Sequence, residues 1–132
     1  MFVIVAGSGR MGRHVAETLF ESGHDVMVVD HSQRALSLLS DSFGGFTARG
    51  DISETETLRS IGIADADLLI ASTGDDNVNL LAARMAHSVY GVEKVIVRTK
   101  DPLKVELFER LGFQAVCPIL LGAERILDML DQ

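Results

Sequence analysis

The sequence predicts an α/β fold in which one doubly wound, six-stranded parallel sheet carries helices on both faces. Three observations predict it. Short apolar runs rich in Val and Ile alternate with longer amphipathic stretches, this unit occurs six times, and no Pro- or Ser-rich linker interrupts the 132 residues. The expected strand order is 3-2-1-4-5-6, and residues 1–132 are expected to form a single domain.

Each expected strand is brief enough to be covered on both faces and is followed by a helix pattern. The six strands are expected at Phe2–Ala6, Asp25–Val29, Phe46–Arg49, Leu68–Ala71, Lys94–Val97 and Gln114–Cys117. Because ligands bind at the carboxyl ends of parallel strands where the strand order reverses, the loops after strands one and four are expected to form the site.

The first three helices have recognisable starts or faces. Apolar residues spaced by four place one face of the first helix on the sheet, and Gly23 ends that helix. Ser32 is expected to cap the second helix. Ser53 and Glu56 have the spacing of a capping box, which predicts the start of the third helix.

The last three helices are marked by apolar spacing and by their ends. The fourth is expected to use Val78, Leu81, Ala82, Met85 and Val89 and to stop at Gly91. Asp75 and Asp76 are expected to cap it. The fifth should run from Asp101-Pro102 to Gly112, and the last from about Leu120 to the end.

Composition and charge exclude several classes of function. A formal charge of -7 disfavours direct binding to nucleic acid or to an anionic membrane surface. No apolar run approaches the ~20 residues that span a bilayer, so direct membrane insertion is not expected. Met1 leads straight into a strand pattern rather than a signal peptide, and a single cysteine, Cys117, cannot form an internal disulfide. The cytoplasm is the expected compartment.

A glycine-rich motif of the form G-x-G-x-x-G lies between the first strand and the first helix. It consists of Gly7, Ser8, Gly9, Arg10, Met11 and Gly12. In this context the first glycine allows a tight turn, the second lets a pyrophosphate approach the backbone, and the third lets the helix pack closely on the sheet. The helix N-terminus attracts phosphates, so the motif predicts a dinucleotide-binding Rossmann fold.

Asp30 follows Gly12 by 18 residues, at the end of the second strand. There an ionised carboxylate can accept hydrogen bonds from both ribose hydroxyls of an adenosine. The same charge repels a ribose 2′-phosphate and therefore argues against NADP. His31 and Arg34 lie close enough in sequence to soften that repulsion, although a solvated helix start explains them equally well.

Three further clusters match the loops that should ring a nucleotide. They are Gly50-Asp51-Ile52, the run from Ser72 to Asn77, and Arg98 after the fifth strand. With Arg10 inside the first loop, they resemble the RCK or KTN domain, the nucleotide-binding regulatory unit of bacterial potassium channels and of Trk- and Ktr-type potassium transporters. The likeness extends over essentially the whole chain.

The resemblance implies roles for individual residues. Asp51 and Ile52 would flank the adenine, Thr73 and Gly74 would lie against the phosphates or second ribose, and Arg98 would reach the phosphate end. Arg10 would meet a terminal phosphate, which a guanidinium group suits. For Arg98 a surface arginine, and for Asp51 an ordinary turn aspartate, remain the alternatives.

The implied function is regulatory binding of NAD(H) or an adenine nucleotide (ATP, ADP or AMP), with control of an integral-membrane potassium channel or transporter subunit. The alternative is the cofactor-binding domain of an NAD-dependent oxidoreductase. No catalytic or metal-binding set is evident, because the four histidines lack ligand spacing and no second domain supplies an acid or base. Trk-type subunits continue into a further domain, whereas this chain ends at Gln132, as a stand-alone version or an excised domain would.

The final helix is too apolar for one face. Leu120, Ala123, Leu127 and Leu130 form one stripe, suited to packing on the sheet, whereas Ile119, Ile126 and Met129 extend the apolar surface sideways. A second partner is implied, because an open apolar patch favours aggregation. Members of the resembled family pair their Rossmann units, so a homodimer, or a higher assembly of such dimers, is expected through this helix.

Overall fold

A computed structural model describes residues 1–131, and its centre is a six-stranded, all-parallel sheet in the order β3-β2-β1-β4-β5-β6. This is the predicted fold class and strand order. The strands are β1 (Phe2–Ala6), β2 (Asp25–Asp30), β3 (Phe46–Arg49), β4 (Leu68–Ala71), β5 (Lys94–Arg98) and β6 (Gln114–Val116). Each boundary lies within one residue of the predicted one.

Six α-helices connect or follow the strands. They are α1 (Arg10–Glu21), α2 (Gln33–Ser37), α3 (Thr55–Ser60), α4 (Asp76–Arg84), α5 (Lys104–Arg110) and α6 (Pro118–Leu130). A short 3-10 turn, Ile63–Asp65, precedes β4, and a π-helical turn, Met85–Val89, continues α4.

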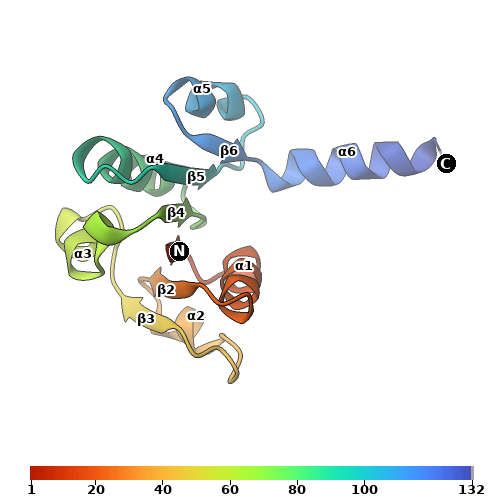
Figure 1. The fold of residues 1–132 in the computed structure, drawn as a ribbon. Helices are drawn as coiled ribbons and strands as arrows, with labels where there is room; N and C mark the ends of the chain where they lie inside the picture. The colour runs from red at the N-terminus through yellow and green to blue at the C-terminus, as the bar shows by residue number, and fades with distance from the viewer. Residues whose placement is uncertain (132) are drawn as a thin grey trace.

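Two apolar cores lie on opposite faces of the sheet because successive strand residues point to opposite sides. Val3, Val5, Val26 and Val28 face the side that α1 and α2 cover. Ile4, Leu69, Val95 and Val97 face the other side, where α3 supplies Leu58, α4 supplies Ala82 and Ala83, and the π-helical turn supplies Ala86. Figure 1 shows α1 and α2 on one side of the sheet and α3 and α4 on the other.

The strand order reverses beside β1, which pairs with β2 on one edge and β4 on the other. The connection from β1 turns toward β2, and the chain returns to β4 only after β3 is complete. A crevice therefore opens at the carboxyl ends of these strands, as in other open α/β sheets.

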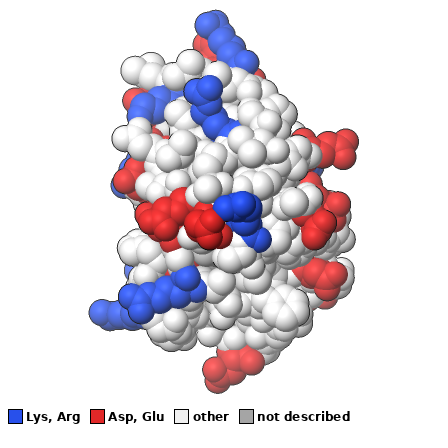
Figure 2. Space-filling model, turned by 90° about the vertical axis from the view of Figure 1, so that its left-hand side faces the viewer, with Lys and Arg blue, Asp and Glu red and all other residues white. Residues whose placement is uncertain are grey.

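Charged side chains are dispersed on the face that α3 and α4 cover. Acidic and basic groups are interspersed with neutral residues there, and neither sign forms a continuous patch among the residues described (Figure 2). Within residues 1–131, no helix has both the length and the apolar character needed to cross a membrane.

The predicted capping box at the start of α3 is wrong. The helix begins at Thr55 after Glu54, and no side chain caps it. The Ser53 hydroxyl instead donates to Asp51 Oδ1 at 2.7 Å, and the Ser53 amide donates to the same oxygen at 2.9 Å. Asp51 thus forms a local turn that competes successfully for the hydroxyl.

The predicted apolar face of α4 is only partly correct. Leu81 and Val89 are exposed, at 47% and 68%. The helix instead buries small alanines and Asn79, which allows it to lie close to the sheet. The π-helical turn also widens the spacing near its end, so Val89 no longer follows the four-residue rhythm of the preceding helix.

The last helix does not pack on the sheet at all. Figure 1 shows α6 projecting away from the body of the domain, and none of its residues is buried. The stripe expected to face the sheet, Leu120, Ala123, Leu127 and Leu130, is therefore exposed together with the rest of the helix. Pro118 occupies the first turn of α6, where its missing N–H removes no bond within the helix.

Candidate functional site

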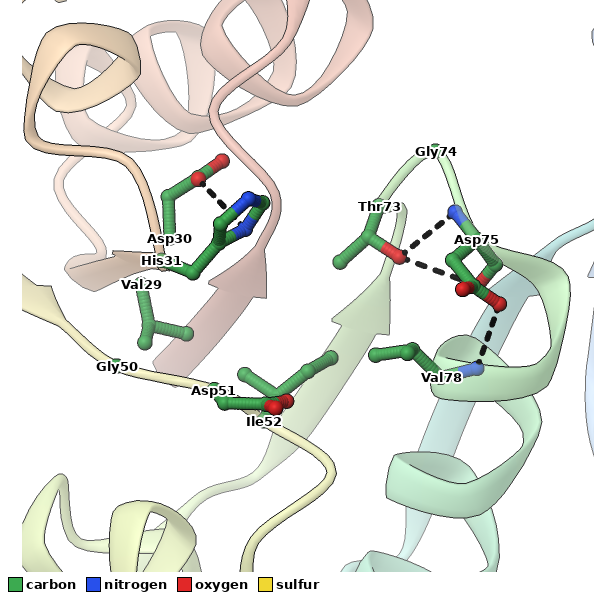
Figure 3. Close-up of a pocket in the computed structure, with 10 residues that line it drawn as sticks. All are labelled: Val29, Asp30, His31, Gly50, Asp51, Ile52, Thr73, Gly74, Asp75 and Val78. Carbon is green, nitrogen blue, oxygen red and sulfur yellow. Dashed lines mark hydrogen bonds and ion pairs between the residues drawn. The ribbon is translucent and has the colours of Figure 1, made fainter.

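A pocket of about 330 Å³ lies where β2, β3 and β4 end, at the reversal of the strand order. We call it the switch-point pocket. Its walls are formed by Val29, Asp30, His31, Gly50, Asp51, Ile52, Thr73, Gly74, Asp75 and Val78. Figure 3 shows these residues arriving from three strand ends and from the first turn of α4.

One part of the pocket is apolar. Val29 and Ile52 are buried residues of the core, and Val78 packs against that core from α4. Their side chains reach the pocket from different elements (Figure 3). An apolar slot of this kind suits a flat aromatic ring, which gains free energy when it leaves water.

Asp30 forms the pocket wall at the end of β2, and its carboxylate is held in a fixed orientation. Its Oδ2 accepts a hydrogen bond from the Ser8 amide and its Oδ1 one from the Ser32 amide, both at 2.8 Å. A carboxylate has about four lone-pair positions, so each oxygen can still accept a hydrogen bond from a ligand hydroxyl. The two amides fix the direction in which those positions point.

Asp51 contributes a second carboxylate. The hydrogen bonds from the Ser53 hydroxyl and amide lower the pKa of Asp51, and the nearby His31 acts in the same direction. The carboxylate is therefore ionised at neutral pH, and it can accept hydrogen bonds but donate none. It follows directly after Gly50, whose amide donates to the Asp30 carbonyl at 3.0 Å.

The loop after β4 is fixed by one buried side chain. Asn79 Oδ1 accepts from the Thr73 amide at 2.9 Å and from the Thr73 hydroxyl at 2.6 Å, while its Nδ2 donates to the carbonyls of Thr73 and Arg98. Asn79 is 0% exposed. It therefore fixes the pocket wall at Thr73 relative to the end of β5.

Asp75 and Asp76 behave differently at the start of α4. Asp75 is the N-cap and accepts from the amides of Asn77 and Val78, as predicted. Asp76 does not cap the helix. Its carboxylate accepts from the Thr99 hydroxyl and the Lys100 amide, and so ties α4 to the segment after β5.

The glycine-rich turn packs as the motif predicts. Gly7 has a φ of +110°, a conformation that other residues rarely adopt, and a Cβ there would lie 2.7 Å from the Ser72 carbonyl oxygen. A Cβ at Gly12 would collide with the Gly7 carbonyl. Both positions require glycine because α1, β1 and β4 approach one another closely here.

The N-terminus of α1 presents backbone amides without a capping side chain. Its N-cap is Gly9, no side chain accepts from its first turn, and no acidic residue lies in that turn. The first amides of a helix have no acceptor within the helix, so they and the helix dipole favour an anion. A Cβ at Gly9 would meet no protein atom within 4 Å, so this approach is open.

Ser8 lies in the turn, whereas Arg10 and Met11 begin α1. Ser8 is buried, its amide is engaged by Asp30, and its hydroxyl donates to the Ala35 carbonyl at 2.8 Å. Its amide is thus used inside the protein, and Ser8 joins the turn to β2 and α2. Arg10 is exposed at the first helical position, and Met11 is half-buried.

Arg98 is the last residue of β5, whereas it was expected in the loop that follows this strand. Its Nε is buried and has no hydrogen-bond partner in the structure. Buried donors of charged groups are nearly always paired, so this N–H is available to an acceptor. Arg98 does not line the switch-point pocket.

The structure brings six of the predicted site residues into one pocket: Asp30, His31, Asp51, Ile52, Thr73 and Gly74. It places the remaining seven outside that pocket, in the turn before α1, in the first turn of α1 and at the end of β5: Gly7, Ser8, Gly9, Arg10, Met11, Gly12 and Arg98.

Sequence reasoning missed four lining residues and one supporting residue. The lining residues are Val29, Gly50, Asp75 and Val78, and the supporting residue is Asn79. Gly50 and Asp75 belong to two of the loop clusters expected around a nucleotide, so their sequence proximity to Asp51 and Gly74 could have identified them as lining residues. Among the residues described, no group of three or more His, Cys, Asp or Glu side chains could hold a metal ion.

Fold and site together define a class. An open parallel sheet in the order 3-2-1-4-5-6, with a glycine-rich turn and a pocket at the reversal of strand order, is a Rossmann-type domain. More narrowly, the model of the TrkA-N domain family matches residues 3–118, and the chain belongs to this family. The resemblance drawn from the glycine-rich turn and the three loop clusters is thereby confirmed.

Individual proteins agree with this membership. The chain is 36% identical over 127 residues to the Trk system potassium uptake protein TrkA of Streptomyces coelicolor, covering 96% of this chain and 57% of that protein. It therefore spans little more than half the length of that relative.

Two solved structures share the fold over nearly the whole chain. The NAD(P)-binding domain of an exopolyphosphatase-related protein from Archaeoglobus fulgidus is 28% identical with a TM-score of 0.80, covering 98% of this chain and 96% of that one. The Kef CTD of Shewanella denitrificans in its AMP-bound form is 26% identical with a TM-score of 0.75, covering 98% and 82%.

Proposed function

We propose that this domain binds an adenine nucleotide, NAD(H) or one of ATP, ADP and AMP, and thereby regulates potassium transport through an integral-membrane partner at the cytoplasmic face of the membrane. The observation that carries the proposal is the division of charge between the switch-point pocket and the start of α1. The pocket holds acceptors, and the helix start holds donors.

The pocket suits the adenosine part of the ligand. Its polar side chains include the carboxylates of Asp30, Asp51 and Asp75, and its lining contains no lysine or arginine. Carboxylates accept hydrogen bonds, and an adenosine offers donors in its ribose hydroxyls and its exocyclic amine. They also repel phosphates, so the phosphates on the ribose 5′ side must lie outside this pocket.

The neighbouring turn suits those phosphates. The start of α1 combines unoccupied first-turn amides with an open approach over Gly9. Arg10 stands exposed at the same place, and the unpaired Nε of Arg98 lies at the end of β5. We assign these two arginines to the phosphates, because a guanidinium group pairs well with phosphate oxygens.

Relatives support both halves of the proposal. The Streptomyces coelicolor relative is named a potassium uptake protein, which supports the link to potassium transport. The Archaeoglobus fulgidus domain is described as NAD(P)-binding, and the Kef CTD was solved with AMP. A bound nucleotide regulates such an assembly only by binding one conformation more tightly than another, so the regulated partner must sense the pocket's occupancy.

Nucleotide binding is tested by calorimetry with AMP, ADP, ATP, NAD and NADH, together with mass spectrometry of any nucleotide released by denaturing the purified protein. At least one of these ligands should bind with a micromolar Kd, and GMP should bind at least about tenfold more weakly. If none of the five binds at millimolar concentration, the proposal is wrong.

Two variants on α4 locate the binding. Val78→Arg fills the apolar slot and should abolish binding. Leu81→Arg, one turn further along the same helix on its exposed side, is the matched control and should bind like the unaltered protein. Equal binding by both variants, with unchanged melting temperatures, would place the ligand elsewhere.

A further inference from the structure

One corner of the switch-point pocket combines a fixed negative charge with a titratable group. His31 Nδ1 lies 3.4 Å from Asp30 Oδ1, and the His31 side chain is 84% exposed whereas that of Asp30 is 12% exposed. In Figure 3 the imidazole ring lies on the side of Asp30 that faces Thr73 across the pocket. The ring therefore stands beside the carboxylate where a ligand would approach it.

The charged groups near His31 come from several segments of the chain. Asp30 ends β2, Arg49 ends β3, Asp51 and Asp75 line the other walls of the pocket, and Arg34 follows His31 by three residues on α2. Arg49 Nε donates to the His31 carbonyl at 3.1 Å, which holds the backbone of His31 in place. Carboxylates and guanidinium groups ordinarily keep their charge between pH 6 and pH 8, whereas histidine changes its charge in this range.

We propose that His31 determines whether the pocket accepts a phosphate on the ribose 2′ position, and that acceptance increases as its imidazole becomes protonated. The inference rests on the proposed function, because it concerns the adenosine that this pocket would hold. Its ligand class is the 2′-phosphorylated adenine nucleotides, of which NADP is the dinucleotide form.

The geometry supplies the reason. Two backbone amides hold the Asp30 carboxylate, so it cannot turn away from a 2′-phosphate and repels it. A protonated imidazole at 3.4 Å offsets that charge and adds an N–H donor for a phosphate oxygen. Arg34 and Arg49 add a constant positive background, so they cannot produce a change between pH 6 and pH 8.

The experiment compares AMP with 2′,5′-ADP, which differs from AMP only by the 2′-phosphate, by calorimetry at pH 8 and pH 6. The unaltered protein should prefer AMP at pH 8 by at least about tenfold, and the preference should shrink by about threefold or more at pH 6. The 2′-phosphate itself titrates near pH 6, so the result is compared with a variant that lacks the imidazole.

Three variants separate the contributions. His31→Gln should show a clearly smaller change with pH than the unaltered protein. His31→Arg, with a permanent charge, should bind 2′,5′-ADP at pH 8 at least about threefold more tightly while AMP binding stays the same. His14→Gln changes an exposed histidine of α1 outside the pocket and should behave like the unaltered protein.

Two results would overturn the inference alone: an identical pH response in His31→Gln and the unaltered protein, or no gain in His31→Arg, while AMP still binds. A different result, in which AMP and the other adenine nucleotides fail to bind at either pH, would overturn the proposed function and this inference with it.

Discussion

Asp30 has a structural role in the glycine-rich turn and a proposed binding role in the pocket. A single substitution affects both. Its carboxylate accepts from the Ser8 and Ser32 amides, so it braces the glycine-rich turn as well as facing the pocket. The sequence indicated the second role from the distance between Asp30 and Gly12. It could not indicate the first, because that contact depends on how closely the turn approaches β2.

Asp30→Ala should weaken adenine-nucleotide binding by about 1 to 3 kcal/mol, the cost of removing a charged hydrogen-bond partner. Calorimetry measures the loss, and a thermal melt reports how far the turn itself is destabilised. Asp25→Ala removes an exposed carboxylate at the other end of the same strand and is the control. Unaltered affinity in Asp30→Ala would contradict the assignment of Asp30 to the ribose.

Other single residues show where sequence reasoning succeeds and where it stops. The glycine requirements at Gly7 and Gly12 were predictable because the motif fixes local geometry. Val29 and Val78 were not predictable as pocket walls, since apolar residues of this kind are indistinguishable in sequence from the rest of the core. They meet in one lining because the fold places the first turn of α4 across the pocket from the ends of β2 and β3.

At the scale of elements, the apolar runs predicted the strand positions correctly. The sequence did not predict where α3 begins or which face α4 buries. Buried parallel strands have continuous apolar sequences, so their positions can be identified with little ambiguity. The prediction for the start of α3 failed because the Ser53 hydroxyl donates to Asp51 and does not accept from an amide of the helix. The prediction of the buried face of α4 failed because that helix buries alanines and Asn79, whereas larger apolar residues remain exposed.

Asn79→Ala should lower the free energy of unfolding by about 2 to 4 kcal/mol, because it leaves the Thr73 amide and the Arg98 carbonyl without their partner in a buried position. Denaturant unfolding measures this change. Asn77→Ala, two residues away on the exposed side of α4, is the matched control and should change stability by less than about 0.5 kcal/mol. Equal effects would mean that the Asn79 bonds contribute no net stability.

The same bonds connect two parts of the proposed site. Asn79 joins the pocket wall at Thr73 to the strand that carries Arg98, and Asp76 joins α4 to the segment after that strand. The switch-point pocket and Arg98 therefore belong to one braced unit.

For the whole molecule, the regulatory proposal and the oxidoreductase alternative differ in turnover. The purified protein should produce no NADH from NAD and a panel of alcohols and hydroxy acids, because nucleotide binding by this domain alone supplies no acid or base beside a nicotinamide. Absorbance at 340 nm measures the product. Steady NADH formation, proportional to protein concentration and lost in Val78→Arg, would favour the alternative.

The largest departure from the sequence-based expectation is the isolation of α6. Sequence spacing suggested that one stripe would pack on the sheet, whereas the whole helix projects away from it (Figure 1). Spacing identifies which residues share a face, but it does not reveal where the chain directs the helix after β6. The consequence is a larger exposed apolar surface than the sequence alone implied, because Leu120, Leu127 and Leu130 are exposed as well.

An apolar helix that projects into water requires a partner, since contiguous exposed apolar surface is unfavourable and promotes association. We predict a homodimer in which α6 of each copy lies in the interface, so light scattering at micromolar protein should give twice the 14.3 kDa chain mass. Ile126→Glu or Met129→Glu places a charge in that interface and should give a folded monomer, whereas Arg34→Glu, on α2, should remain dimeric. A monomer in the unaltered protein would contradict the prediction and leave the helix to be covered by a different segment or partner.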